Sequence, residues 1–381
     1  MEQVYFDYAA STPLDPRVRM AVDVAHALVG NPSSLHRSGR EVRAAIDRAR
    51  GQIARLICAA DNEVVFTSGA TEANGVAITG VLRAIKKQFP QLVPHIVTSE
   101  FEHASITETL AQQDDARVTY VTPGRDGVVT ADVVAAAITE ETVIVCVMWV
   151  NNVLGTVQPI EAISVVIAAE RARRGAGGLP IVFICDAVQA IATLPISDEA
   201  ADILTISAHK MYGPKGVGAI RIASGTPFAS VYGGGGQENG RRHGTENVMG
   251  IVGFGEAAMV LLAERARDVE HITTLRYILF DGLQRNVPAA AQVGAEGVPG
   301  TIFLRIPGER GDELALKLDT AGFAVSAGSA CDAGKRRAPR ALEAVLDEQS
   351  ALKGGVRVSF GRFTTEQEIK DFVATLAKMV R

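Results

Sequence analysis

The chain has little cysteine and no long apolar run. Its four cysteines are scattered over 381 residues, and no C-x-x-C spacing indicates a zinc site or a redox-active dithiol. No segment approaches the roughly 18 uninterrupted apolar residues that a membrane helix needs. We therefore expect no metal site and no membrane span.

The chain also lacks an excess of positive charge. The formal net charge is −5, the pI is about 5.9, and aromatic residues make up only 5% of the chain. Because there is no basic stripe with interleaved aromatics, we expect no direct nucleic-acid binding. The first residues, MEQVYFDYAAS, include acidic side chains and lack the apolar core of a signal peptide, which predicts a cytoplasmic location.

Between about residues 40 and 220, helical stretches alternate with short apolar, β-branched runs. This alternation is typical of βαβ units and predicts an α/β fold with a mainly parallel sheet. Most runs are apolar throughout, as expected for strands that helices cover on both faces. The candidate strands are Glu63–Phe66, His95–Thr98, Val118–Val121, Val143–Trp149, Ile181–Cys185 and Ile203–Ile206.

The length of the chain favours one large domain and one smaller domain, because a single simple core rarely extends over so many residues. We assign residues 15–260 to the large domain. Residues 1–14 and 261–381 would form the smaller α+β domain, and a long helical stretch from about Ile251 to Arg276 would join the two.

Polar residues follow most of the candidate strands. Because ligands of open α/β sheets bind at the carboxyl ends of the strands, we expect these residues to gather at one edge of the sheet. They are Thr67 to Glu72, Glu102 with His103, Asn151 with Asn152, Asp186 with Gln189, and Ser207 to Lys210.

Lys210 stands out among them. It follows the apolar run DILTIS and a histidine, and it precedes the turn Met-Tyr-Gly-Pro-Lys-Gly, which would fix its position. A lysine held in this way can form a Schiff base with an aldehyde cofactor. Pyridoxal 5'-phosphate further needs a carboxylate for its ring nitrogen, a phosphate cup, and a group against the ring face.

Each of these needs has a candidate. Asp186 ends an apolar strand and could pair with the ring nitrogen, although it could also be a helix N-cap. The segment Thr67–Thr71 joins a strand to a helix start that would attract an anion, and the hydroxyls of Thr71 and Ser207 could add hydrogen bonds. His103 could stack on the ring or serve only as a polar cap.

The four cysteines differ in their surroundings. Cys58, Cys146 and Cys185 lie in apolar segments and are predicted to belong to the core. Cys331 lies among small residues in SAGSACDAGKRR, where neither a helix nor a strand period can be drawn.

These features resemble the cysteine desulfurases of the NifS/IscS type, in the class V aminotransferase group of fold type I pyridoxal-phosphate enzymes. That fold has a large domain with a mainly parallel sheet of the seven-stranded type. The resemblance runs almost end to end, through YFDYAASTPLDPRV, GNPSSLHRSGR, FTSGATEAN, SEFEHASI, VNNVLGTVQPI, DAVQA, SAHKMYGPKGVGA, GGGQENGRRHGTEN, SAGSAC and VRVSFGRFTTEQEI.

The resemblance implies a role for each matching residue. Lys210 would hold the cofactor and, with His103, move protons, while Cys331 would receive the sulfur of L-cysteine as a persulfide. The substrate carboxylate would bind Arg357, and Asn152 would contact the substrate or the ring hydroxyl. The remaining cofactor contacts would be Asp186 at the ring nitrogen, Gln189 at the ring hydroxyl, Ala70, Thr71, Ser207 and His209 at the phosphate, and Thr245 at the phosphate of a neighbouring subunit.

The resemblance thus implies a homodimer with shared active sites. It also implies a sulfur-acceptor protein, whose identity and pathway, iron–sulfur cluster assembly or tRNA thiolation, the sequence does not reveal. For Arg357 the residues give independent support, because VRVSF alternates and places Arg357 and Ser359 opposite Val356, Val358 and Phe360.

Two departures from the family pattern leave questions open. Val153 stands where the family usually has glutamate, so proton handling or loop geometry could differ there. Lys335, Arg336 and Arg337 follow Cys331 and would either favour its thiolate or dock the acceptor. Alternative functions are a selenocysteine lyase, an aminotransferase, or a catalytically weak subunit that carries sulfur or regulates its transfer.

Overall fold

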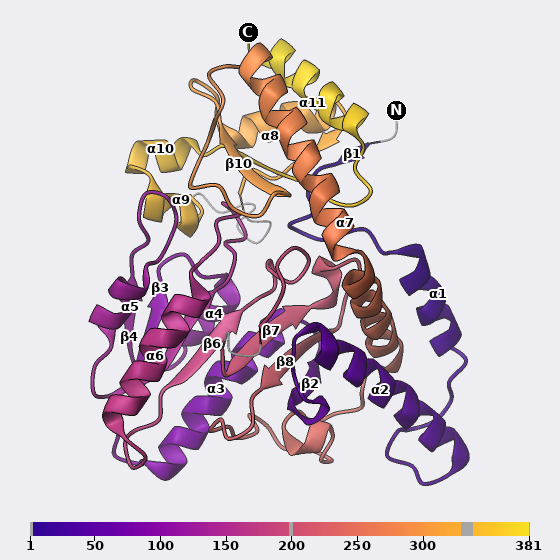
Figure 1. Cartoon of the computed structure of the whole chain (residues 1–381), viewed down its shortest axis with the longest axis vertical. Coiled ribbons are helices and arrows are strands. Elements are labelled where there is room, and N and C mark those ends of the chain that lie inside the picture. The colour runs from indigo at the N-terminus through magenta and orange to yellow at the C-terminus, as the bar shows by residue number, and fades with distance from the viewer. Residues whose placement is uncertain (1–2, 198–200, 329–337, 381) are drawn as a thin grey trace.

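A seven-stranded sheet forms the centre of the protein. The computed structural model describes residues 3–197, 201–328 and 338–380 (Figure 1). The strand order is β2-β8-β7-β6-β5-β3-β4; β3 to β7 are mutually parallel, and β8 runs antiparallel to both of its neighbours. The strands are β2 (Val64–Thr67), β3 (His95–Ser99), β4 (Arg117–Val121), β5 (Thr142–Met148), β6 (Val182–Asp186), β7 (Ile203–Ser207) and β8 (Gly218–Ile222).

The mainly parallel sheet and the six candidate strands are confirmed, with ends that shift by about one residue. Strand β8 was not predicted. Its apolar run is interrupted by Gly216 just before the strand, by Gly218 at its start and by the charged Arg221. The sequence of this segment is therefore more typical of a turn. Arg221 is nevertheless buried, beside Glu63.

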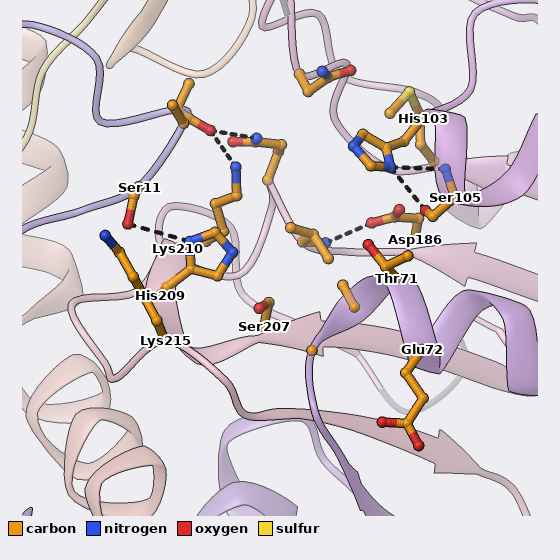
Figure 2. A pocket seen from close by; sticks show the side chains of 18 of the residues that line it. Ser11, Thr71, Glu72, His103, Ser105, Asp186, Ser207, His209, Lys210 and Lys215 are labelled. Atoms are coloured by element: carbon orange, nitrogen blue, oxygen red, sulfur yellow. Dashed lines mark hydrogen bonds between the residues drawn. The ribbon is translucent and has the colours of Figure 1, made fainter. Parts of the chain in front are cut away.

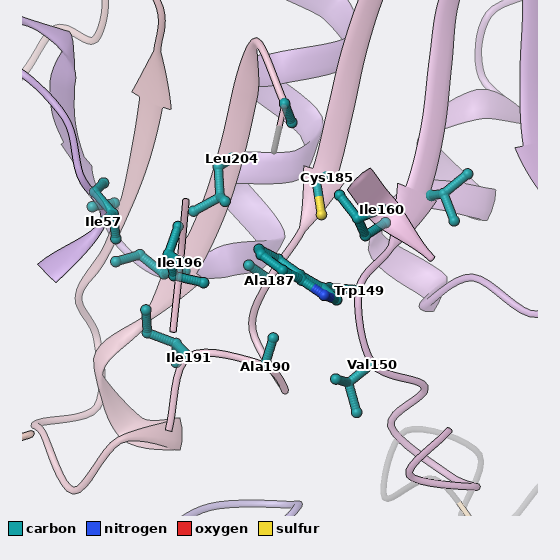
Figure 3. Close-up of a cluster of buried hydrophobic side chains, with 14 of the residues drawn as sticks. Ile57, Trp149, Val150, Ile160, Cys185, Ala187, Ala190, Ile191, Ile196 and Leu204 are labelled. Carbon is teal, nitrogen blue, oxygen red and sulfur yellow. The ribbon is translucent and has the colours of Figure 1, made fainter. Parts of the chain in front are cut away.

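Helices cover both faces of this sheet, as its apolar strands predicted. Successive residues of β5 alternate between two cores: Ile144 and Cys146 pack with α3 and α4, whereas Val145 and Val147 pack on the opposite face. Figure 3 shows part of that second core, around Trp149. The helices of this part are α1 (Pro16–Ala25), α2 (Arg37–Leu56), α3 (Ala70–Gln88), α4 (Ala104–Leu110), α5 (Ala131–Ala137) and α6 (Ile160–Arg174).

A separate core lies at the C-terminal end of the long helix α7 (Val248–Asn286), near the chain termini (Figure 1). It packs Phe6 from the N-terminal segment against α7, α11 and the sheet β12-β10-β9. The domain boundary near residue 260 stays a proposal. The elements here are β1 (Val4–Tyr5), β9 (Ala291–Gln292), β10 (Thr301–Arg305), α8 (Gly311–Thr320), β11 (Phe323–Ala324), α9 (Arg340–Val345), α10 (Glu348–Lys353), β12 (Val356–Ser359) and α11 (Glu366–Met379).

One predicted core residue is wrong. Cys58 is exposed, because α2 ends at Leu56 and the chain leaves the helix through Cys58 in a left-handed conformation, with φ of 51°. Its apolar neighbours turn inward while the thiol stays outside. Cys146 and Cys185 are buried, as predicted. Within the described residues, no helix has both the length and the apolar character needed to cross a bilayer.

Candidate active site

Most of the predicted polar residues line one cavity of about 580 Å³ at the edge of the sheet where its parallel strands end, whereas Thr67, Glu102 and Asn151 do not. The cavity brings together segments that lie more than 300 residues apart, from Ala9 to Arg357. Among the described residues, every predicted site residue except Thr245 lines it, and Figure 2 shows several of them. Those that line it are Ala70, Thr71, His103, Asn152, Asp186, Gln189, Ser207, His209, Lys210 and Arg357.

Lys210 lies on a short 3-10 turn, Ala208–Lys210, that directly follows β7. Its Nζ donates a hydrogen bond to the carbonyl oxygen of Ala9, and the side-chain amide of Gln189 donates to the same oxygen at 3.0 Å (Figure 2). The N-terminal segment therefore helps to place both side chains. Tyr212, with φ of 64°, then reverses the chain.

Asp186 is the last residue of β6 and is almost completely buried. One carboxylate oxygen accepts the backbone N–H of Val188 at 3.0 Å, and the other accepts the side-chain amide of Asn74 at 2.8 Å. These two donors fix the carboxylate at the cavity wall (Figure 2). Asp186 accepts the N–H of Val188 as a capping residue would, and it also lines the cavity.

His103 is the N-cap of α4, and its imidazole also lines the cavity (Figure 2). Its Nδ1 accepts the backbone N–H of Ser105 at 3.1 Å and lies 2.8 Å from the Ser105 hydroxyl oxygen. An acceptor nitrogen carries no proton, so the proton of the neutral imidazole is on Nε2. The interpretation as a cap is therefore confirmed, and the role against the cofactor ring stays a prediction.

The start of α3, where an anion cup was predicted, borders the cavity. Gly69, Ala70 and Thr71 line the cavity at the positive end of this 19-residue helix. Gly69 has φ of 157°, and a Cβ at Gly218 would lie 2.8 Å from the Gly69 backbone, so both positions need glycine.

His209 lines the same cavity as this cup. Burial, together with the positive charges of Lys210 and Lys215, lowers the pKa of His209 to about 4. The imidazole is therefore neutral at pH 7 and can donate one hydrogen bond to an anion.

Several lining residues were not singled out as site residues from the sequence, among them Ser11, Lys215 and Glu72. Ser11 lies 3.3 Å from His209 Nδ1, and Lys215 follows in the turn after Lys210. Glu72 borders the cup. Burial raises the pKa of its carboxyl group, but the hydrogen bonds from Arg242 and Ser68 outweigh burial and lower the pKa to about 2. The signal for Glu72 was present, since it belongs to the polar segment after β2.

Arg357 is 1% exposed and reaches the cavity from β12. Its guanidinium donates to the carbonyl oxygen of Asn152 and to Asp7, both at 2.7 Å. The buried Nε has no hydrogen-bond partner within the described residues. Val356, Val358 and Phe360 pack in the opposite core, so the predicted alternation is confirmed.

Thr245 is exposed and does not line the cavity of its own subunit. A contact across a dimer would require such exposure, and that role stays a prediction. Cys331 and the basic residues Lys335, Arg336 and Arg337 lie outside the described residues. The described His, Cys, Asp and Glu side chains form no group that could hold a metal ion.

Glu102 precedes His103 in the sequence and is buried. One carboxyl oxygen accepts from Ser99 and from the backbone N–H of Met148, and the other has no partner in the described part of the chain. Burial raises the pKa of Glu102 to about 8. The two hydrogen bonds oppose this increase, and the nearby charge of Asp186 adds to it. Glu102 therefore carries a proton at pH 7.

We expect the free energy of unfolding of Glu102→Gln, relative to that of the wild type, to increase as the pH rises. The unfolded chain releases this proton near pH 4.5 and the folded chain near pH 8, so the wild type loses stability across that window. The glutamine variant lacks this loss, worth roughly 3 to 5 kcal/mol. Urea unfolding at pH 5 and pH 8.5 would measure it, with the exposed Glu140→Gln as control; equal pH slopes for Glu102→Gln and the wild type would contradict the expectation.

Val153, the departure from the family pattern, is buried in the apolar core and does not line the cavity. The Asn151 side chain holds its loop by accepting the backbone N–H groups of Val153 and Leu154, each at 2.9 Å. The loop is therefore ordered without a carboxylate at position 153.

We expect Val153→Glu to lower the free energy of unfolding by about 3 kcal/mol, because it buries an unpaired carboxylate. Val153→Leu, which adds volume without charge, serves as the control. Urea denaturation at pH 7.5 measures both, and a glutamate variant as stable as the wild type would show that the loop offers the new carboxylate a partner.

Comparison with known proteins agrees with this geometry. The aminotransferase class-V family matches residues 4–372. The chain is 35% identical over 385 residues to the cysteine desulfurase IscS of Dictyoglomus turgidum, covering 99% of this chain and 94% of the relative.

Solved structures agree as well. A NifS-like protein superposes with a TM-score of 0.88 at 31% identity, covering 99% of both chains. The structure of SspA in complex with cysteine superposes with a TM-score of 0.80 at 31% identity, covering 95% of this chain and 100% of that one. The family match spans nearly the whole chain, and the chain therefore belongs to the aminotransferase class-V family.

Proposed function

We propose that the protein is a cysteine desulfurase, which uses pyridoxal phosphate to convert L-cysteine to L-alanine and transfers the sulfur to Cys331. The observation that carries this proposal is the single cavity into which Lys210, Asp186 and the start of α3 all face. Sequence relatives and structural neighbours with desulfurase names support the same activity.

The residues of the cavity fit pyridoxal phosphate, the cofactor of class-V aminotransferases. Lys210 provides the amine for the aldehyde, Asp186 an acceptor for the ring N–H, and His103 a flat group for the ring face. The cup of Ala70, Thr71, Ser207 and neutral His209 suits the phosphate. When bound, the cofactor supplies an electron-withdrawing ring that stabilises negative charge on the substrate.

The protein groups bind the substrate and move its protons. Arg357 holds the substrate carboxylate, and its contacts with Asp7 and Asn152 keep the guanidinium in place. The Lys210 amine and the His103 imidazole move the proton at the substrate Cα.

The thiolate of Cys331 then attacks the substrate sulfur. An S–S bond forms and the C–S bond breaks, and the electron pair of the C–S bond stays on the carbon skeleton, which takes up a proton and leaves as L-alanine.

Purified protein tests the proposal directly. We expect a visible cofactor absorption band that changes with L-cysteine, and release of alanine and sulfide in equal amounts when a thiol reductant is present. A selenocysteine lyase would act on L-selenocysteine and not on L-cysteine, and an aminotransferase would need a 2-oxo acid. Absence of alanine from L-cysteine would reject the desulfurase.

We expect Arg357→Leu to lower kcat/KM for L-cysteine about 100-fold, mainly through KM, because a charge-assisted carboxylate contact is lost. The variant also leaves Asp7 without its ion pair. Asp7→Asn serves as the control, since it removes that pair and keeps the guanidinium. Steady-state kinetics separate the two, and an unchanged KM in Arg357→Leu would assign the guanidinium to structure alone.

The proposal includes a homodimer and an acceptor protein for the sulfur. Strongly exposed apolar side chains on α1 and the loop after it, Met20, Val24, Val29 and Leu35, provide a surface for a second subunit. Light scattering should then give twice the 40.2 kDa mass of the chain. The cytoplasmic location and the identity of the acceptor stay predictions from the sequence.

A further inference from the structure

Asn74 is a fully buried amide in the interior of α3, and it does not line the cavity. Its side chain contacts three residues from three other elements: Asp186 at 2.8 Å, Ser105 at 2.9 Å and Thr205 at 2.6 Å. Asparagine is unfavourable inside a helix, and its burial is tolerated only where every polar atom has a partner. The contacts with other elements, and not helix formation, therefore account for an asparagine at this position.

The three contacts fix the orientation of the amide. The hydroxyl of Thr205 donates to Asn74 Oδ1, and the Nδ2 group donates to Asp186 Oδ2 and to Ser105 Oγ. A carboxylate only accepts hydrogen bonds, so a flipped amide would place two acceptors face to face. All the polar atoms of the Asn74 side chain are used in this one orientation.

The chain of hydrogen bonds continues from Ser105 to His103. Because Ser105 Oγ accepts from Asn74, its single hydrogen is available for His103 Nδ1 at 2.8 Å. The backbone N–H of Ser105 donates to the same nitrogen at 3.1 Å. The Nδ1 atom thus receives two donors, and the proton of the imidazole stays on Nε2.

We propose that Asn74 is a positioning residue that holds Asp186 and His103 in one hydrogen-bonded chain and thereby sets both sides of the cofactor site together. The inference rests on the proposed function, in which Asp186 faces the ring nitrogen and His103 faces the ring. Neither side chain is then placed independently of the other, because both are linked to the same buried amide.

The variant Asn74→Leu has a similar volume and no donor. Without the amide, the Ser105 hydroxyl is free to turn away from His103, which leaves the Ser105 backbone N–H as the remaining donor to Nδ1, so the Nδ1 signal of His103 should shift. Nitrogen-15 NMR of histidine-labelled, cofactor-free protein measures it, with His103→Gln to assign the signals. Asp186 also loses one of its two donors, and we expect pyridoxal-phosphate affinity to fall about tenfold in an absorbance titration.

Two threonine variants complete the experiment. Thr205→Val removes the hydroxyl that orients Asn74 and should cause a smaller change in the same direction. Thr98→Val is the matched control, since Thr98 is equally buried in β3 of the same sheet and its hydroxyl has no partner within the described residues. We expect Thr98→Val to match the wild type in the His103 signals and in cofactor affinity.

The proposal is overturned if folded Asn74→Leu, as judged by circular dichroism, keeps wild-type His103 signals and cofactor affinity. An equal change in Thr98→Val would also overturn it, because the effect would then be general to the core. If Asn74→Leu does not fold, Thr205→Val decides, and unchanged His103 signals would reject the proposal. No substrate is used, so failure to make alanine from L-cysteine would count against the function alone.

Discussion

Replacing Lys210 by alanine is expected to remove the visible band of the bound cofactor and to lower sulfide release from L-cysteine by at least about 1000-fold. The amine is the one group in the proposed site that attaches the cofactor covalently and also moves the substrate proton. Its position at the end of β7, in contact with Ala9, places it on a rigid element and not on a long loop.

Lys215→Ala is the matched comparison, because Lys215 lines the same cavity five residues later but is exposed. We expect this variant to keep the visible band and to lose less than about tenfold in activity. Borohydride treatment followed by peptide mass spectrometry should find the cofactor on Lys210. Attachment to Lys215, or a band that survives in Lys210→Ala, would contradict the assignment.

The sequence predicted the sheet well because buried parallel strands have a strong signal. Runs such as that of β5 are apolar throughout, since both faces are covered, and the polar residue after each run marks the end of the strand. The same reasoning failed at β8, whose Gly218 lies close to the backbone of Gly69 and whose Arg221 pairs with Glu63. A local pattern cannot reveal a partner that is distant in the sequence.

The site was predicted where a residue follows a strand, and missed where tertiary contacts decide. Asp186 and Lys210 follow buried strands, and the cavity gathers both. Ser11 lies in the N-terminal segment, which gives no sign of reaching His209, and Asn74 lies inside a helix. The polar residue in that helix interior was the one available clue, because such a residue needs a buried partner.

Cys58 was misplaced for a related reason. The apolar segment IARLIC predicts burial, but α2 ends two residues before the thiol, and the end of a helix is poorly defined by composition. The correction matters for the chemistry, because Cys58 is an exposed thiol that activity measurements must separate from Cys331.

Replacing Cys331 by alanine is expected to abolish sulfide and alanine release from L-cysteine, by at least about 1000-fold, and to preserve the visible cofactor band and its response to L-cysteine. Cofactor and substrate binding depend on other side chains, whereas sulfur transfer needs a nucleophile. Cys146 and Cys185 cannot replace it, since burial raises the pKa of both thiols well above the usual value and keeps them protonated.

The described residues before the Cys331 segment lie beside Arg357. Ser326 pairs with Arg357 through two backbone hydrogen bonds, and Gly328 lies against Pro339 on the far side of the segment that carries the thiol. The two described ends of this segment therefore lie close together, and a residue before it, Ser326, pairs with the arginine proposed to hold the substrate carboxylate. Cys58→Ala is the control and should keep full activity, because its thiol does not line the cavity. Alkylation with and without L-cysteine, read by mass spectrometry, should find the persulfide on Cys331 alone; a persulfide on Cys58, or an active Cys331→Ala, would instead favour an aminotransferase-like site with a different route for sulfur.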